Sequence, residues 1–490
     1  LTANFSSQIG TIRSDFYGVN DGFIMMSNLT YIDTDGDNVV DTLGDYQFYR
    51  NALLNSGIKS VLLWVDLTSI SLGEGLWNST KINKIKNEIE FLNNNNKTII
   101  LNLRGGIPIY LRNITSPYCN STYYSSCPPN DTTKFVELYE NLINNITNNG
   151  ENNYSMKLEL WNEPYSSSWL GNLSNQTLKG VELAYYFSML YNNLTTKYPF
   201  LEVGGCAFFY VHPNITSGFL SSLTSDIDFI SIHPYDYGLS NSLIQLSSYN
   251  SLIANCSAYG VDCGYVMLSE WTLGTSALQN YSWLQNQYGM SWANSYQSLL
   301  NNYPSNISSV GFQLATYGPY GTIYYTGYKY HWISQAGVDT ASNVYYIPYN
   351  ITKNFANLCP AGGTVYQSSS DDSTIKTVSC KKGNQRSFIV INTDTSSKNV
   401  TVNLTNSGIT TLTNYLDNSE TFTASGSTNI GIMDSYDIKY LTEDLQSPTI
   451  TINSPTASTY STTNIDFNIT LDEEGSWCGY SLDGASNISM

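Results

Sequence analysis

Short apolar runs alternate with amphipathic stretches through the first two thirds of the chain. Runs of this length are typical of buried strands, and the stretches between them carry apolar residues at helical spacing. The runs are Phe16–Asn20, Ile58–Val65, Thr98–Leu103, Met156–Leu160, Leu201–Gly205, Ile227–Ile232, Tyr265–Glu270 and Val310–Tyr317. Strands that alternate with helices predict a parallel sheet, and this order predicts a (β/α)8 TIM barrel of class α/β over residues 15–335.

The pattern changes near residue 340, where short β-type runs follow one another between Ser, Thr, Asn and Gly turns and no helical period competes. We therefore expect a β-sandwich over residues 336–445, which residues 1–14 could join. Residues 446–490 contain three more strand-like runs. Three strands are too few for a complete immunoglobulin-like domain, so this segment is predicted to be a partial immunoglobulin-like β module.

Two of the predicted barrel strands end on a glutamate beside a tryptophan. Met156–Leu160 runs into Trp161-Asn162-Glu163-Pro164, and Pro164 cannot continue a strand. Tyr265–Leu268 runs into Ser269-Glu270-Trp271. Barrel enzymes carry their catalytic groups at the carboxyl ends of the strands, and a pair of carboxylates is what retaining glycoside hydrolysis requires. Glutamates that merely cap the strands are the simpler reading, but a buried, unpartnered carboxylate is costly.

Composition points to an extracellular protein. The net charge is -18 at pH 7 with 12% charged residues, a balance that repels polynucleotides and argues against a nucleic-acid partner. About twenty Asn-x-Ser/Thr triplets predict N-linked glycans, although an Asn-rich chain forms some of them by chance. Examples are Asn28, Asn78, Asn113, Asn145, Asn214, Asn306, Asn350 and Asn403. No apolar run is long enough to predict a transmembrane segment.

Cysteine spacing supports the same compartment. Three pairs each close a short segment, which suits local disulfides in an oxidising environment. The pairs are Cys119 with Cys127, Cys256 with Cys263, and Cys359 with Cys380. A protein secreted or displayed in this way could associate with the cell surface through its C-terminal β modules.

One acidic loop has a spacing that could hold a hard cation. Asp33, Asp35, Asp37 and Asp41 alternate around Gly36. Oxygen ligands at such intervals can surround a structural Ca²⁺, although the glycine is not where an EF-hand requires it. A solvated acidic turn is the alternative.

The motifs at the strand ends resemble those of clan A, the large clan of retaining (β/α)8 glycoside hydrolases, and most of all its branch of β-xylosidases and α-iduronidases. The resemblance is carried by Trp161–Pro164, His233-Pro-Tyr235 and Ser269–Trp271. It implies a carbohydrate substrate, an acid/base role for Glu163, a nucleophilic role for Glu270, and double displacement through a covalent glycosyl-enzyme. No cofactor is required by such chemistry.

The resemblance also implies further substrate contacts. Asn162 would donate to the sugar 2-hydroxyl, and Tyr235 or His233 could hydrogen-bond Glu270. Aromatic or cationic side chains near the mouth could contact the sugar as well, with ordinary barrel packing as the alternative; they are Trp64, Trp161, Trp271, Arg104 and Tyr317. Many relatives place an arginine near the end of strand two, where this chain has Leu62–Asp66. Either Arg104 from strand three substitutes for it, or this contact is missing.

A different class of function fits part of the same pattern. The many Asn-x-Ser/Thr triplets and the Tyr-rich composition, with 40 tyrosines, would also suit a surface-layer or matrix glycoprotein that binds glycans on a catalytically idle hydrolase fold. The glutamate pair argues against it, because an idle site has no reason to retain two buried acids.

Overall fold

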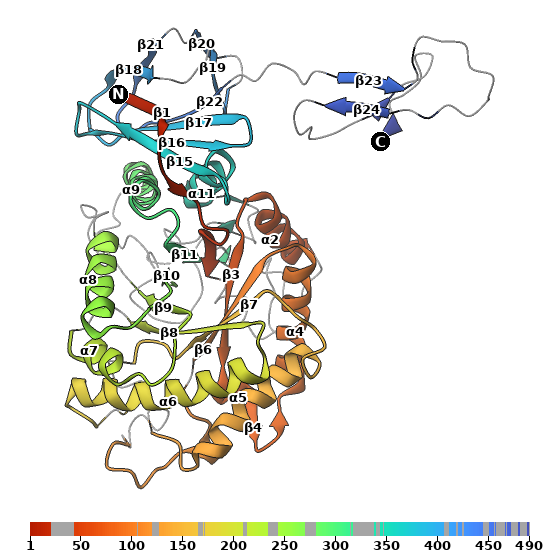
Figure 1. The fold of residues 1–490 in the computed structure, drawn as a ribbon, viewed down its shortest axis with the longest axis vertical. Helices are drawn as coiled ribbons and strands as arrows, with labels where there is room; N and C mark the ends of the chain where they lie inside the picture. The colour runs from red at the N-terminus through yellow and green to blue at the C-terminus, as the bar shows by residue number, and fades with distance from the viewer. Residues whose placement is uncertain are drawn as a thin grey trace.

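The computed structural model contains a closed α/β barrel and a large β-sheet, which lies above the barrel in Figure 1. It describes residues 1–490 except 21–43, 105, 120–126, 165–169, 171, 209–212, 234–243, 270–280, 314, 317–337, 340–343, 346, 406–410, 418–419, 424–425, 444–449, 455, 457–465, 467, 472–478, 481–487 and 490.

The barrel is closed by parallel strands in the order expected from the sequence. Each neighbouring pair is parallel, and β11 returns to pair with the first strand. In chain order the strands are β2 (Tyr17–Asn20), β3 (Ser60–Asp66), β6 (Thr98–Arg104), β7 (Met156–Leu160), β8 (Leu201–Phe208), β9 (Phe229–Ile232), β10 (Tyr265–Leu268) and β11 (Ile307–Gln313). The predicted α/β barrel is therefore confirmed.

Helices follow these strands and surround them. They are α2 (Gly44–Asn55), α4 (Ser79–Asn94), α5 (Thr132–Thr147), α6 (Gln176–Lys197), α7 (Pro213–Ser222), α8 (Ile244–Tyr259) and α9 (Tyr281–Asn302). Short elements interrupt two of the loops, namely α3 (Leu67–Ile70), the hairpin β4 (Ser71–Gly73) with β5 (Leu76–Trp77), and the 3₁₀ turn η1 (Ile109–Leu111). Side chains of Asn78, Asp131 and Asn175 accept backbone N–H groups at the starts of α4, α5 and α6, which fixes where these helices begin.

The two faces of each barrel strand bury different side chains. Leu63, Leu101 and Ile230 belong to the large cluster shared with the surrounding helices. The residues beside them in the chain, Leu62, Ile100 and Phe229, form a separate cluster with Tyr265 and Met267. Because side chains alternate along a strand, this second cluster fills the inside of the barrel. It separates the two ends of the barrel.

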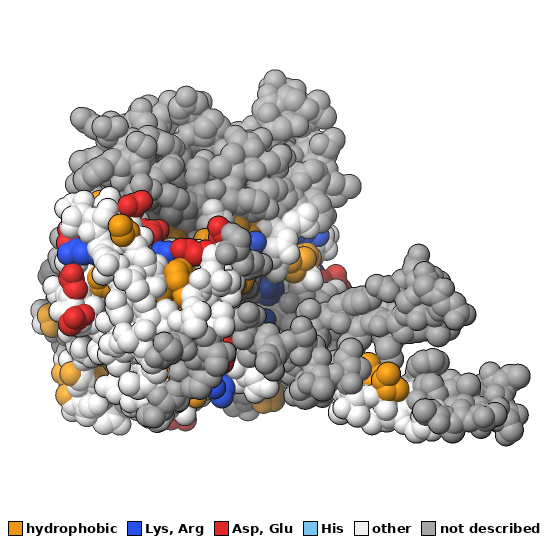
Figure 2. All heavy atoms as spheres, turned by 90° about the horizontal axis from the view of Figure 1, so that it is seen from above, with side chains coloured by type: hydrophobic (Ala, Val, Ile, Leu, Met, Phe, Trp, Pro, Cys, Tyr) orange, Lys and Arg blue, Asp and Glu red, His pale blue; other side chains and the backbone are white. Residues whose placement is uncertain are grey.

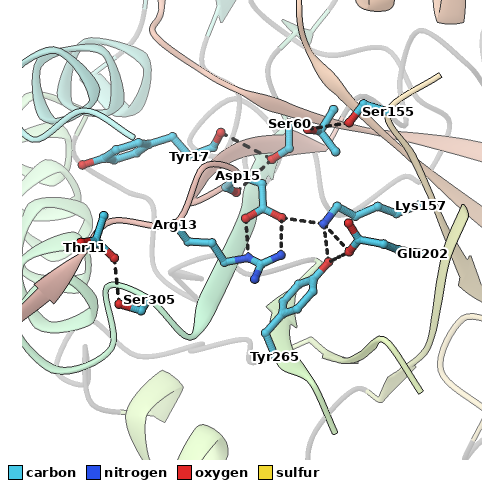
Figure 3. A network of polar contacts seen from close by, with 11 residues as sticks. Thr11, Arg13, Asp15, Tyr17, Ser60, Ser155, Lys157, Glu202, Tyr265 and Ser305 are labelled. Atoms are coloured by element: carbon cyan, nitrogen blue, oxygen red, sulfur yellow. Dashed lines mark hydrogen bonds and ion pairs between the residues drawn. The ribbon is translucent and has the colours of Figure 1, made fainter. Parts of the chain in front are cut away.

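A buried network of charged groups closes the amino-terminal end of the barrel (Figure 3). Lys157, the second residue of β7, lies 2.8 Å from both Asp15 Oδ2 and Glu202 Oε2, and it also donates to the Tyr265 hydroxyl. Arg13 Nε lies 2.5 Å from Asp15 Oδ1. All of these groups lie near the first residues of their strands, at the end of a barrel that usually contributes stability rather than chemistry.

The large sheet has nine strands and includes the first strand of the chain. Its order is β20-β19-β22-β17-β16-β15-β1-β18-β21. The strands are β1 (Thr2–Thr11), β15 (Thr364–Ser369), β16 (Ile375–Lys382), β17 (Gln385–Asn392), β18 (Lys398–Thr405), β19 (Thr411–Asn414), β20 (Thr421–Thr423), β21 (Ser427–Met433) and β22 (Ile438–Glu443). β1 pairs antiparallel with β15 and parallel with β18. The hydrogen-bond order gives one continuous sheet, and its division into the two layers of a sandwich stays a prediction.

One helix in this half of the chain was not expected. The sequence predicted only β-type runs beyond residue 340, but α11 spans Ile347–Leu358 after the short strands β12 (Ala315–Thr316), β13 (Val338–Asp339) and β14 (Val344–Tyr345). Ile351, Phe355 and Leu358 recur at helical spacing and are buried in the cluster that contains the barrel. The Tyr17 hydroxyl also donates to the carbonyls of Phe355 and Cys359, so α11 joins the barrel to the sheet. Because Pro348 and several Asn and Thr residues occupy this stretch, its helical period is hard to recognise in the sequence.

The three predicted disulfides are present. They join Cys119 to Cys127, Cys256 to Cys263, and Cys359 to Cys380. The third links the end of α11 to β16 and thus ties the helix to the sheet. Cys206 is a buried free thiol on β8.

The last part of the chain forms two small antiparallel pairs, seen apart from the large sheet in Figure 1. β23 (Ile450–Ser454) pairs with β24 (Asn468–Leu471), and β25 (Gly479–Tyr480) pairs with β26 (Ile488–Ser489). The partial immunoglobulin-like module stays a prediction.

Over the described part of the upper face, Figure 2 shows mostly uncharged polar side chains and backbone, with charged groups in small clusters.

Candidate active site

Glu163 lies just beyond the carboxyl end of β7, on a strained stretch of backbone. Trp161 has φ of 65° and Glu163 has φ of 51°, both in the left-handed region that residues with side chains rarely adopt. The Glu163 N–H donates to the Ala207 carbonyl at 3.0 Å, and Ala207 itself has φ of 51°. Strain of this kind persists only where the surroundings hold it, and it is concentrated at functional sites.

The carboxylate of Glu163 contacts a histidine from another strand. Its Oε1 lies 3.0 Å from Nδ1 of His233, which follows β9. The imidazole is fully buried, and its backbone N–H donates to the Phe208 carbonyl at 2.7 Å. The Glu163 side chain remains 25% exposed, so it is only partly buried. A carboxyl group in this position can exchange a proton with a molecule in the mouth.

A second glutamate lies beneath Glu163, and the sequence analysis did not identify it. Glu159 is fully buried on β7, where Asn102 of β6 donates to its Oε2 at 2.6 Å. Burial raises the pKa of Glu159, while the charge of His233 and hydrogen bonds from Ser231, Ser269 and Asn102 act in the opposite direction. The one signal in the sequence was the alternation of Lys157 and Glu159 with apolar residues, which aims both charges into the barrel.

Asn102 connects this buried acid to the backbone before Glu163. Its Nδ2 donates to Glu159 Oε2 and also, at 3.3 Å, to the carbonyl of Trp161. The Trp161 ring is 6% exposed and packs beside Phe135 in the core. Asn162 Oδ1 is buried without a hydrogen-bond partner, so a donor from a bound molecule could satisfy it. Substrate contacts by Trp161 and Asn162 stay predictions.

Arg104 and Trp64 form a stacked pair on neighbouring strands. The Arg104 guanidinium lies 4.1 Å from the centre of the Trp64 ring, and Trp64 packs against the cluster inside the barrel. Trp64 pairs with Asn102 in the β3–β6 register. The Arg104 guanidinium, from the third barrel strand, thus lies beside Trp64 of the second barrel strand. Whether it takes the place of the arginine that relatives carry on strand two stays a prediction.

The remaining predicted site residues lie outside the described residues. They are Glu270, Trp271, Tyr235, Tyr317 and the candidate calcium ligands Asp33, Asp35, Asp37 and Asp41. Ser269, which directly precedes Glu270, is described; its N–H donates to the Ile232 carbonyl at 3.2 Å, one residue before His233. The position before Glu270 thus lies beside the strand end that carries His233.

Two kinds of feature are absent from the described residues. Within the described ranges, no group of three or more His, Cys, Asp and Glu side chains is placed to hold a metal ion. Among the described helices, none combines the length and the apolar character needed to cross a membrane.

The sequence matches no protein-family model and no curated protein. Its fold, in contrast, matches those of solved glycoside hydrolases. A GH30 endoxylanase from Clostridium papyrosolvens C71 is 13% identical, with a TM-score of 0.61 over 91% of this chain and 99% of that one. A GH39 enzyme from Xanthomonas axonopodis pv. citri is 14% identical, with a TM-score of 0.61 over 90% and 96% of the two chains. A family 51 α-L-arabinofuranosidase from Bifidobacterium longum is 12% identical, with a TM-score of 0.59 over 90% and 99%. The predicted resemblance to clan A hydrolases is confirmed at the level of the fold.

Proposed function

We propose that this protein is a retaining glycoside hydrolase that cleaves O-glycosidic bonds of oligo- or polysaccharides. The observation that carries the proposal is the position of Glu163. It follows the fourth strand of a closed barrel, its carboxylate contacts His233 at 3.0 Å, and its side chain is partly exposed. The fold shared with a xylanase and an arabinofuranosidase supports the same class of reaction.

In the proposed mechanism, Glu163 acts first as an acid and then as a base. Protonated Glu163 gives its proton to the glycosidic oxygen while Glu270 attacks the anomeric carbon and the bond to the leaving group breaks. The product of this step is a glycosyl-enzyme joined to Glu270. Glu163, now ionised, takes a proton from water as the water attacks the same carbon. The bond to Glu270 breaks, which regenerates its carboxylate, and the sugar is released with its configuration retained.

The other predicted side chains would bind the sugar. Asn162 would contact the 2-hydroxyl, and His233 and Tyr235 would orient the carboxylates. Aromatic and cationic contacts would come from Trp161, Trp271, Arg104 and Tyr317. No cofactor takes part in these steps, and a Ca²⁺ ion held by Asp33, Asp35, Asp37 and Asp41 would be structural.

We further propose that the protein acts outside the cell. The three disulfides and the many Asn-x-Ser/Thr triplets support an oxidising, glycosylating compartment. The barrel at 15–335 would be the catalytic domain, the β-sandwich at 336–445 an accessory domain, and residues 446–490 part of a module that associates with the cell surface.

Replacement of Glu163 tests the acid/base assignment. We expect Glu163→Ala to lose roughly 10²–10⁴-fold in kcat/KM on glycosides with poor leaving groups, because these need a proton as the bond breaks. Substrates with good leaving groups should lose much less, and azide should restore turnover by replacing water in the second step. The measurement is initial-rate kinetics over a series of aryl glycosides, with identification of the glycosyl azide.

Glu151→Ala is the matched control, because Glu151 is an exposed glutamate in the loop that precedes β7. It should leave the leaving-group dependence unchanged. Wild-type rates for Glu163→Ala on poor leaving groups would contradict the proposed function.

A further inference from the structure

Glu159 is a buried acid to which the proposed reaction assigns no role. Its register partner on β6 is Asn102, and its side chain points into the barrel four residues before Glu163. A carboxylate in such a place is costly unless the surroundings are built for it. Here the surroundings consist of an amide, two hydroxyls and an imidazole, all at the end of the barrel that carries Glu163.

The first connection from Glu159 to Glu163 runs through the backbone. Asn102 Nδ2 lies 2.6 Å from Glu159 Oε2 and 3.3 Å from the Trp161 carbonyl. Because Glu159 holds this amide in place, the amide can hold the left-handed Trp161, two residues before the catalytic glutamate. The Glu163 N–H is then fixed by the Ala207 carbonyl, and the Ala207 N–H by Ser231 Oγ at 2.8 Å.

The second connection runs through side chains. The His233 imidazole contacts Glu163 Oε1 on one side, and its charge acts on Glu159 beneath. Ser231, which belongs to the hydrogen-bonding environment of Glu159, is two residues before His233 on the same strand. Burial and the nearby Glu159 raise the pKa of the buried Cys206 thiol. This electrostatic effect of His233 on Glu159 accompanies the link through Asn102.

We propose that Glu159 is a positioning residue for acid catalysis, which holds the Glu163 carboxyl in its working orientation through Asn102. The proposal rests on the proposed function. Glu159 itself exchanges no proton with the substrate, because it is fully buried. Its effect should be largest in the step in which Glu163 protonates a poor leaving group, since this step depends most on the orientation of the acid.

The test uses two variants and a leaving-group series. Glu159→Leu removes the hydrogen bond and the charge at similar volume, and Glu159→Gln removes only the charge. Glu159→Leu leaves the Asn102 amide without this acceptor, so its Tm should fall by several degrees, and the rates are compared at a temperature at which both proteins are folded. We expect its kcat/KM to fall by about tenfold or more for poor leaving groups and by less than about threefold for good ones. Glu159→Gln should lie between Glu159→Leu and wild type.

Glu88→Gln is the matched control. Glu88 is a buried glutamate on α4 that pairs with Arg50 outside the barrel, and its replacement should leave the ratio of rates unchanged. An equal loss on all leaving groups, or no loss, for Glu159→Leu would overturn the proposal while leaving the proposed function intact. The proposed function itself would fail if wild type hydrolysed no glycoside or if Glu163→Ala matched it.

Asn102→Ala provides a second route if Glu159→Leu does not fold. It leaves Glu159 in place and breaks the link to the Trp161 carbonyl. The same selective loss on poor leaving groups is expected, and a uniform loss would contradict the positioning role.

Discussion

Two charged side chains on β7 point into the barrel and are balanced in different ways. Lys157 meets Asp15 and Glu202 at the amino-terminal end, whereas Glu159 meets Asn102 and hydroxyl groups near the mouth. At one end Lys157 and Arg13 outweigh burial and lower the pKa of Asp15, whereas at the other end burial raises the pKa of Glu159.

The buried Asp15 makes stability depend on acid pH. Burial alone would raise the pKa of Asp15, but the charges and hydrogen bonds of Lys157 and Arg13 outweigh it and lower the pKa below its ordinary 3.8. Since the folded-state pKa is lowered, the stabilisation is present above pH 3.8 and is lost as the pH falls through the folded-state value. We expect Asp15→Asn to lower the free energy of unfolding by roughly 3 kcal/mol at pH 7, and by less at pH 3, as measured by urea unfolding.

Asp226→Asn serves as the control for this change, because Asp226 is exposed in the loop after α7. Its unfolding midpoint should match that of wild type at both pH values. A difference between Asp15→Asn and wild type that stays constant from pH 7 to pH 3 would contradict the assignment.

The residues that could be predicted from the sequence are those whose position follows from local pattern. Glu163 could be recognised because it follows an apolar strand and is itself followed by Pro164, which cannot continue that strand. Glu159 was not, because its partners Asn102, Ser231 and Ser269 are distant in the chain and only the closed barrel brings them together. The contact between His233 and Glu163 likewise depends on the separation of β7 and β9 by a single strand.

At the scale of elements, the period of the apolar residues was sufficient to place the barrel strands to within a few residues. The same pattern did not predict α11, because the buried face of this helix is defined by its packing on α9 and the barrel, which are distant in the chain.

The close packing of α6 on α7 could not be predicted from the sequence either. Gly180 of α6 and Gly218 of α7 let the two backbones meet, and a Cβ on Gly180 would lie 2.2 Å from the Ile215 carbonyl oxygen.

This contact predicts an unusual sign for a glycine replacement within a helix. Alanine is normally favoured over glycine there by about 1 kcal/mol. Gly180→Ala should instead lower the free energy of unfolding by about 1–3 kcal/mol, because backbone atoms of α7 cannot move away cheaply. Thermal and urea unfolding would measure it, with Asn192→Ala at an exposed position of α6 as the neutral control. A more stable Gly180→Ala would show that the helices do not approach this closely.

At the scale of the whole molecule, the chain begins and continues in the same sheet on either side of the barrel. β1 lies between β15 and β18, so the barrel is inserted between strands that pair with each other. Because β1 pairs with strands that lie hundreds of residues away, no local sequence pattern predicts the pairing. From the sequence, residues 1–14 could therefore only be suggested as part of the sheet. The chain passes from β1 into the amino-terminal end of β2, whereas Glu163 and His233 follow the carboxyl ends of their strands.

The most direct test of this account is mass spectrometry after incubation with a panel of 2-fluoro glycosyl fluorides, which trap the glycosyl-enzyme of a retaining hydrolase. The account predicts a covalent sugar on the peptide that carries Glu270 in the wild-type protein, and the trapped sugar would identify the substrate class. Glu270→Ala is the control and should carry no label. A folded wild-type protein that takes no label from any sugar of the panel would contradict retaining hydrolysis.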